Sequence, residues 1–123
     1  MKLHLSRAEG LNQITSCGID FVSINGVRHE HSLIVTPEEL LPQWPVSAFD
    51  ALSDVHIAAL LPLKADVVLI GTGARLRFPR AHVLRPLIDA RVGYEIMDTG
   101  AACRTYNVLI AEGRRVAAAL ILA

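Results

Sequence analysis

The alternation of apolar and polar positions predicts β structure in the first third of the chain. Leu3 and Leu5 alternate with polar neighbours, as in a half-buried strand. Apolar residues 21–24 lead into Asn25-Gly26, a pair that favours the two positive φ values of a tight hairpin turn. The pattern therefore predicts a β-hairpin whose returning strand runs over residues 27–35.

Two helix starts follow the predicted hairpin. Residues 36–39 combine a capping threonine, a proline at the first helical position and a glutamate three residues on, and Pro42 limits that helix to one turn. Trp44 then lies in a stiff loop before Pro45. Ser53-Asp54 opens a longer helix that ends before Pro62. The apolar positions of this longer helix are Val55, Ala58, Ala59 and Leu61.

Strands and helices alternate in the second half. Residues 67–70 are apolar without alternation, which is typical of a strand covered on both faces. Pro79 begins a helix, and Asp98-Thr99 caps a second helix that Gly113 ends. Further strands are expected at residues 94–97 and 115–122. The order hairpin–β–α–β–α–β predicts one α/β domain over residues 1–123, with three layers and a mixed central sheet between helices.

Composition narrows the function classes. The 123 residues are 52% hydrophobic but only 5% aromatic, and the formal net charge is zero, which argues against a nucleic-acid binder. The apolar runs are far shorter than the ~20 residues of a membrane-spanning helix, and the N-terminus does not have the pattern of a signal peptide. Two cysteines are typical of a reducing compartment. We therefore expect a cytoplasmic protein.

A glycine-rich turn is the first candidate site. Gly71-Thr72-Gly73 follows a buried strand, where glycines let the backbone approach a phosphate, and Arg75, Arg77 and Arg80 follow within the same stretch. The dinucleotide fingerprint would need a third glycine where Leu76 stands. The residues are therefore consistent with either an anion site or a structural turn.

The start of the last helix offers further chemistry. Asp98-Thr99-Gly100-Ala101 matches the aspartic-protease tetrapeptide, but the helical sequence that follows favours Asp98 as a helix cap. Cys103 beside Arg104 would lie near the helix N-terminus, where amides and a cation stabilise a thiolate. Cys103 is thus a candidate reactive thiol, and the alternative is a buried, inert one.

Histidines and arginines elsewhere give weaker signals. His29 and His31 are two apart, a spacing that places both on one face of a strand, but nothing completes a metal-ligand set and we expect no metal site. Arg114 and Arg115 flank the last strand. Together with Arg104 they form either a solvated, partly paired surface or a basic contact surface continuous with the arginines of residues 75–91.

Three segments together resemble the Mth938-like family, a domain of unknown function formerly numbered 498. These segments are residues 68–73, residues 76–79 and the run Glu95-Ile-Met-Asp-Thr-Gly-Ala-Ala-Cys-Arg-Thr-Tyr-Asn-Val-Leu109, of which the last is the most specific. The Asn25-Gly26 hairpin and Trp44 between prolines also fit, so the resemblance covers nearly the whole chain.

The resemblance implies a three-layer β+α/β/α fold with a mixed central sheet, in agreement with the residue pattern. Mitochondrial members of the family are assembly factors for respiratory complex I, and no catalytic residue is established in the family. We expect no mitochondrial targeting segment, and Arg91-Val92-Gly93 replaces the usual Gly-Ile turn. These departures indicate a bacterial relative.

Two functional hypotheses follow. The first is a non-enzymatic, cofactor-free assembly factor whose partners are proteins, including respiratory-complex subunits. The second is a small anionic-ligand-binding or catalytic domain at the carboxyl ends of two parallel strands. Its candidate residues are Gly71, Thr72, Gly73, Arg75, Asp98, Thr99 and Arg104, with Cys103 as the candidate reactive thiol.

Overall fold

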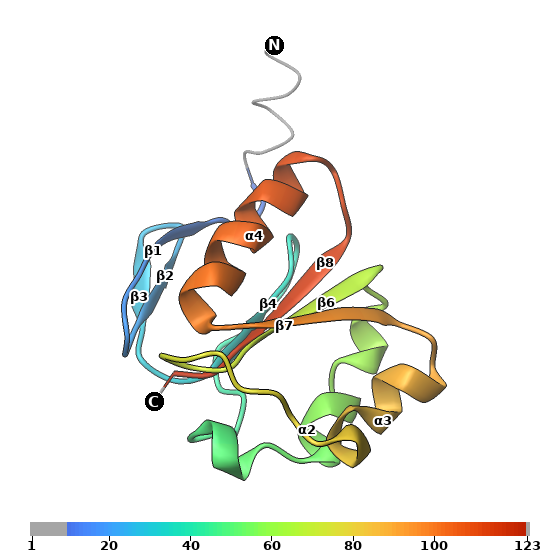
Figure 1. Ribbon diagram of the computed structural model, residues 1–123. Coiled ribbons are helices and arrows are strands. Elements are labelled where there is room, and N and C mark those ends of the chain that lie inside the picture. Colours follow the sequence, from blue (N-terminus) through green and yellow to red (C-terminus); the bar gives the residue numbers. More distant parts are fainter. Residues whose placement is uncertain (1–9, 123) are drawn as a thin grey trace.

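A five-stranded mixed sheet forms the centre of the computed structural model, which describes residues 10–122 (Figure 1). Its strand order is β5-β4-β8-β6-β7, with β6 parallel to both β7 and β8 and with β4 antiparallel to β8. The bounds are β4 Leu33–Val35, β5 Leu40–Leu41, β6 Val67–Gly71, β7 Gly93–Met97 and β8 Val116–Leu120. The predicted mixed α/β fold is confirmed.

A second, three-stranded antiparallel sheet has the order β1-β2-β3. Its strands are β1 Ile14–Cys17, β2 Val22–Ile24 and β3 Val27–His29. Asn25 and Gly26 have φ values of 51° and 86°, the left-handed pair that the Asn-Gly turn predicts. The expected strand at Leu3 and Leu5 lies outside the described residues.

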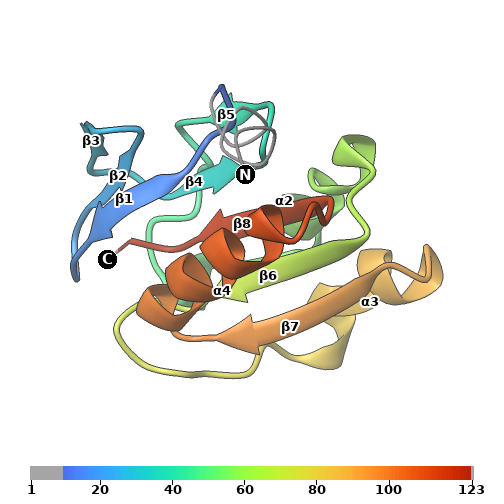
Figure 2. The ribbon, with the colours of Figure 1, turned by 90° about the horizontal axis from the view of Figure 1, so that it is seen from above.

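Helices cover both faces of the central sheet. The longer helices are α3, Ala81–Asp89, and α4, Thr99–Ala111; the short ones are α2 Asp54–Ala58, η1 Phe49–Ala51 and η2 Leu61–Leu63. Helix α4 and the three-stranded sheet lie side by side on one face of the central sheet, whereas α2 and α3 lie on the opposite face (Figures 1 and 2). These are the three layers that the element order predicts.

Two hydrophobic clusters follow from the pleat of the sheet. Alternate residues of β8 face opposite sides, so that Ala118 and Leu120 pack under α4 while Ala117 and Ala119 pack under α2 and α3. The small alanine side chains let both helical layers approach the strand closely. A strand buried on both faces explains the unbroken apolar run in the sequence.

Two predictions about the first half are wrong. The hairpin does not continue through Leu33–Val35, because β3 ends at His29 and β4 belongs to the other sheet. Residues 36–39 form no helical turn. Instead the Thr36 hydroxyl accepts hydrogen bonds from the N–H groups of Glu38 and Glu39, at 3.3 and 2.9 Å, and closes a turn between β4 and β5. Capping and turn residues share this chemistry.

Two smaller corrections concern helix and strand faces. Val55 is 73% exposed, so the buried side of α2 is formed by Ile57 with Leu60 just beyond it. His31 lies past the end of β3, and the shared strand face expected for it and His29 does not exist.

Candidate functional site

The two loops singled out in the sequence meet at the carboxyl edge of β6 and β7 (Figure 2). The Thr72 N–H donates to the Met97 carbonyl at 2.9 Å, and the Thr99 N–H donates to the Gly73 carbonyl at 2.9 Å. Parallel neighbours end at the same edge, so residues 71–73 are held against the start of α4. The structure thus brings together most of the predicted site residues.

The amides of the glycine turn are bonded within the protein. The Gly73 N–H donates to the Thr99 hydroxyl at 2.8 Å, and that hydroxyl donates to the Ile121 carbonyl at 2.8 Å. The Thr72 N–H is also bonded, as described above. An anion cradle needs free N–H groups aimed at the ligand. The anion-site interpretation therefore has no support from the geometry and stays a prediction.

Gly71 is required by close packing of the turn on α4. A Cβ at this position would lie 2.9 Å from the Thr99 Cα and 2.9 Å from the Thr99 Oγ1. Real Cβ atoms do not approach backbone so closely, and Thr99 is fixed at the start of α4. Gly73 has a φ of 103°, where an L side chain is strained. Both glycines thus have structural reasons to be present.

Thr72 organises the next part of the loop. Its side chain is buried, and its hydroxyl donates to the carbonyl of Arg75 or of Met97. The same oxygen accepts from the Arg77 N–H at 3.2 Å. The loop after Gly73 is therefore tied back to the sheet edge by one side chain, and Thr72 itself is turned inward.

The expected helix cap is present at Asp98. Its carboxylate accepts from the Ala101 N–H at 2.8 Å, and its backbone is extended, as at other capping positions. Arg104 is exposed on the second turn of α4, with its guanidinium close to Gly100. Among the described residues Arg104 has no hydrogen-bond or ion-pair partner, in contrast to Asp98 and Thr99.

Cys103 lies on the buried face of α4, and its side chain is part of the core. Burial is the largest cause of a strongly raised thiol pKa, and the neighbouring Cys17 thiol raises it further, while Arg104 has a smaller opposing effect. A buried thiol with a raised pKa is a poor nucleophile. Both the burial of Cys103 and its raised pKa oppose the reactive-thiol interpretation, which stays a prediction.

The end of the long family-like run attaches the small sheet to α4. The Asn107 side-chain amide accepts from the Ile14 N–H at 3.0 Å and donates to the Ile14 carbonyl at 2.7 Å. The buried Tyr106 hydroxyl donates to the Asn12 carbonyl at 2.8 Å, and burial raises its pKa. The helical spacing shows that Tyr106 faces the core. It does not show that Asn107 bonds β1, or that Tyr106 bonds the segment just before β1, 93 and 94 residues away.

The outer part of the β6–α3 connection is exposed. We name residues 74–80, Ala-Arg-Leu-Arg-Phe-Pro-Arg, the arginine–phenylalanine loop. Leu76 is 50% and Phe78 is 71% exposed, and Arg75 and Arg80 are exposed beside them. Apolar side chains gathered between cations on a protruding loop are typical of a contact surface.

A hollow of about 540 Å³ adjoins this loop. Arg77 forms one wall, where its guanidinium pairs with Asp50 at 2.8 Å and stacks on the Phe49 ring at 4.4 Å from the centroid. The residues lining the hollow are Phe49, Asp50, Leu52, Arg77, Phe78, Pro79, Arg80, His82 and Val83. It therefore combines aromatic, cationic and apolar groups from three segments of the chain.

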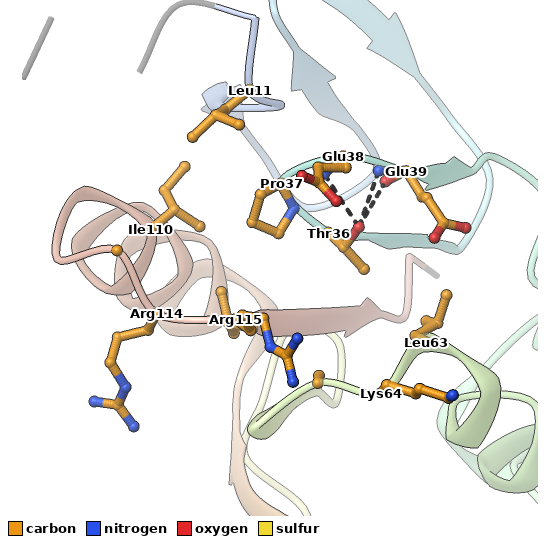
Figure 3. Close-up of a pocket in the computed structure, with 13 residues that line it drawn as sticks. Leu11, Thr36, Pro37, Glu38, Glu39, Leu63, Lys64, Ile110, Arg114 and Arg115 are labelled. Atoms are coloured by element: carbon orange, nitrogen blue, oxygen red, sulfur yellow. Dashed lines mark hydrogen bonds between the residues drawn. The ribbon is translucent and has the colours of Figure 1, made fainter. Parts of the chain in front are cut away.

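A second pocket, of about 320 Å³, opens at the other edge of the sheet (Figure 3). Apolar side chains such as Leu63 and Ile110 line it, with Lys64 and Arg115 at its rim. Figure 3 shows the Arg114 side chain directed away from the pocket, and Arg115 lies 3.7 Å from Asp66 outside it. Glu38 and Glu39 also line the pocket, so it carries groups of both charges.

The basic residues do not form one continuous surface. Arg91 precedes β7 and Arg114 precedes β8, so both lie at the amino edge of these strands, whereas residues 75–80 follow β6 at the opposite edge. Helix α4 ends at Ala111, so about 10 Å of helix and the turn after it separate Arg104 from Arg114. The fold therefore opposes the interpretation of one continuous basic contact surface, because the arginines lie on separate surfaces.

Comparison with known proteins connects this arrangement to a family. The family model described as "Protein of unknown function (DUF498/DUF598)" matches residues 14–121. The bovine "NADH dehydrogenase [ubiquinone] 1 alpha subcomplex assembly factor 3" is 33% identical over 84% of the chain. The chain spans 59% of the length of that relative.

Solved structures share the fold. A crystal structure from Bordetella parapertussis has a TM-score of 0.87 and 38% identity, and covers 94% of the chain and 99% of its own. A solution structure from Bordetella pertussis, described as a Mth938-like domain, has a TM-score of 0.82 and 32% identity, and covers 94% and 88%. Among the described residues, no helix is both long and apolar enough to cross a bilayer.

Proposed function

The chain belongs to the DUF498/DUF598 family, and we propose that it acts without catalysis as a protein-binding assembly factor for a multi-subunit respiratory complex. The observation that carries the proposal is the relationship to the bovine assembly factor, which extends over 84% of the chain. The family model covers residues 14–121, which include both the small sheet and α4.

The roles of the family-like residues support binding over catalysis. Asp98 caps α4, Thr99 bonds two backbone groups, and Asn107 holds β1. These side chains are occupied in maintaining the fold. The exposed side chains of the arginine–phenylalanine loop and Arg104 are among the described groups that remain free to contact a partner. The similarity to proteins from Bordetella supports a bacterial source. We propose a cytoplasmic location, which the names of the relatives do not establish.

A crosslinked pull-down of the tagged, full-length protein from its native cells tests the proposal. Mass spectrometry should find respiratory-complex subunits enriched over an untagged control. An Arg75→Glu or Arg104→Glu variant should lose that enrichment, because both side chains are exposed and have no ion-pair partner among the described residues. Enrichment that is absent, or equal to the untagged control, would contradict the assembly role.

A deletion strain gives a second, independent readout. Native gels should show less fully assembled complex and more of its subassemblies, with restoration by the wild-type chain. Variants with normal stability but no partner enrichment should fail to restore assembly. A normal level of assembled complex in the deletion strain would argue against the proposal.

A further inference from the structure

We propose that the arginine–phenylalanine loop and the hollow beside it bind a protein segment in which carboxylates flank a bulky apolar side chain. This inference rests on the proposed function and names the chemistry of its partner. It concerns the surface at residues 74–80 and the hollow between this loop, η1 and the start of α3.

The apolar side chains of this surface are exposed and could be buried by a partner. Phe78 and Leu76 are two residues apart and both expose at least half of their surface. A single exposed apolar residue is ordinary, but an exposed aromatic beside a second apolar side chain and a hollow is typical of an interface centre. Phe78 also lines the hollow, so a partner's apolar side chain placed there would contact its ring.

The charges of the surface select an anionic partner. Neither Arg75 nor Arg80 has an ion-pair partner among the described residues, while Arg77 is paired with Asp50. The net charge of the chain is zero, so attraction arises from this local group of cations. All the basic residues in the loop are arginines, whose planar guanidinium groups bind carboxylates through two parallel hydrogen bonds.

The loop is held in place before any partner binds. The Thr72 hydroxyl bonds both the Arg75 carbonyl and the Arg77 N–H, and Pro79 fixes the backbone ahead of α3. The Arg77 side chain is in turn fixed between Phe49 and Asp50. A pre-ordered surface loses little conformational entropy on binding.

The hollow favours a protein segment over a lipid surface. A bilayer would cover the protruding Leu76 and Phe78 but would leave a hollow of about 540 Å³ between η1 and the loop unfilled. A side chain from a protein segment can enter it, with Arg77 and Arg80 at its walls. Arginine and aromatic residues are also enriched in protein interfaces, where lysine is depleted.

Site-specific photocrosslinking in native cells tests the inference. A photoreactive benzoylphenylalanine replaces Phe78 in the full-length chain, and in a separate strain it replaces Val27, which is 60% exposed on the β2–β3 hairpin. The crosslinked peptide is then sequenced by mass spectrometry. Position 78 should yield one dominant protein partner, crosslinked at or beside an apolar residue with at least two carboxylates close by in its sequence.

Charge reversal supplies the matched control. Arg75→Glu combined with Arg80→Glu should lower the yield from position 78 by about tenfold or more, because repulsion replaces two ion pairs. Arg91→Glu combined with Arg114→Glu makes the same charge change at the opposite edge of the sheet and should leave the yield unchanged. Reversing the partner's carboxylates to lysine should restore crosslinking to the Arg75→Glu, Arg80→Glu protein.

The outcomes separate this inference from the assembly role. No crosslink at position 78, a crosslink to lipid, a partner peptide without carboxylates, or equal loss in both double variants would overturn it. If the pull-down enriches complex subunits while only position 27 crosslinks them, the assembly role stands and this surface is excluded. If position 78 captures an acidic segment of a protein outside any respiratory complex, the surface stands and the assembly role fails.

Discussion

The inner and outer parts of the β6–α3 connection differ in what their residues do. The inner part, Gly71-Thr72-Gly73, is buried and its polar groups bond to α4 and to the strand ends. The outer part, residues 74–80, exposes two apolar side chains and unpaired arginines. The glycines that suggest a phosphate site are thus structural, and the capacity to bind lies in the residues after them.

Removing the Thr99 hydroxyl should have the largest effect on stability. In Thr99→Val the buried Gly73 N–H and Ile121 carbonyl lose their partner, and each orphaned group costs about 1–3 kcal/mol. We expect the free energy of unfolding to fall by about 4 kcal/mol in urea denaturation. Thr99→Ser, which retains the hydroxyl, should lose only about 1 kcal/mol. Equal losses in the two variants would show that the hydroxyl does not hold the inner part.

A methyl group at Gly71 should be nearly as harmful. Because the new Cβ would meet the Thr99 backbone at 2.9 Å, Gly71→Ala must displace α4 from the sheet, at a cost of about 3 kcal/mol. Gly100→Ala is the matched control, since its Cβ would meet only side-chain atoms at 3.4 and 3.6 Å. Alanine inside a helix should there raise stability by up to about 1 kcal/mol. Thermal unfolding that shows no loss for Gly71→Ala would contradict the packing.

Alkaline pH should lower the stability of the folded protein through the buried Cys103 thiol. Burial raises the thiol pKa of Cys103, so the folded protein keeps a proton that the unfolded chain loses above about pH 8.5. Below that pH the thiol's contribution to stability is fully present. Above it, the free energy of unfolding falls as pH rises, by at most about 1.4 kcal/mol per pH unit for this group. Urea denaturation from pH 7 to 10 should show the fall, with a smaller slope in Cys103→Ala. An unchanged slope would assign the effect to other groups, including Tyr106, whose pKa is also raised.

Changes in the outer part should barely affect stability. Phe78→Ser and Arg75→Glu alter exposed side chains without a structural partner among residues 10–122, so the free energy of unfolding should change by less than about 0.5 kcal/mol. The same variants should lose partner enrichment in the pull-down. A stability loss near that of Gly71→Ala would mean that the loop belongs to the fold rather than to a contact surface.

Local chemistry was sufficient to predict much of the architecture. The Asn25-Gly26 turn, the doubly buried β6 and the capped α4 each depend on neighbouring residues, and the structure confirms them. The capping pattern at Thr36 predicts a helix that does not form, because the same hydroxyl-to-amide bonds stabilise a turn between strands. Local bonds do not reveal whether the chain continues as helix or as strand.

The order and type of most elements, and hence the three layers, could be predicted from the residues alone, since hydrophobic period, capping and turn residues act over a few positions. The fold was needed to show that Thr99 bonds Gly73 and Ile121, that Asn107 holds Ile14, and that the arginines lie at opposite edges of the sheet. Those outcomes depend on groups from distant segments arriving at the same place. Where α4 packs on the sheet edge, the polar groups of the glycine turn are hydrogen-bonded within the protein. The adjacent exposed loop is therefore the part of this connection that can contact a partner.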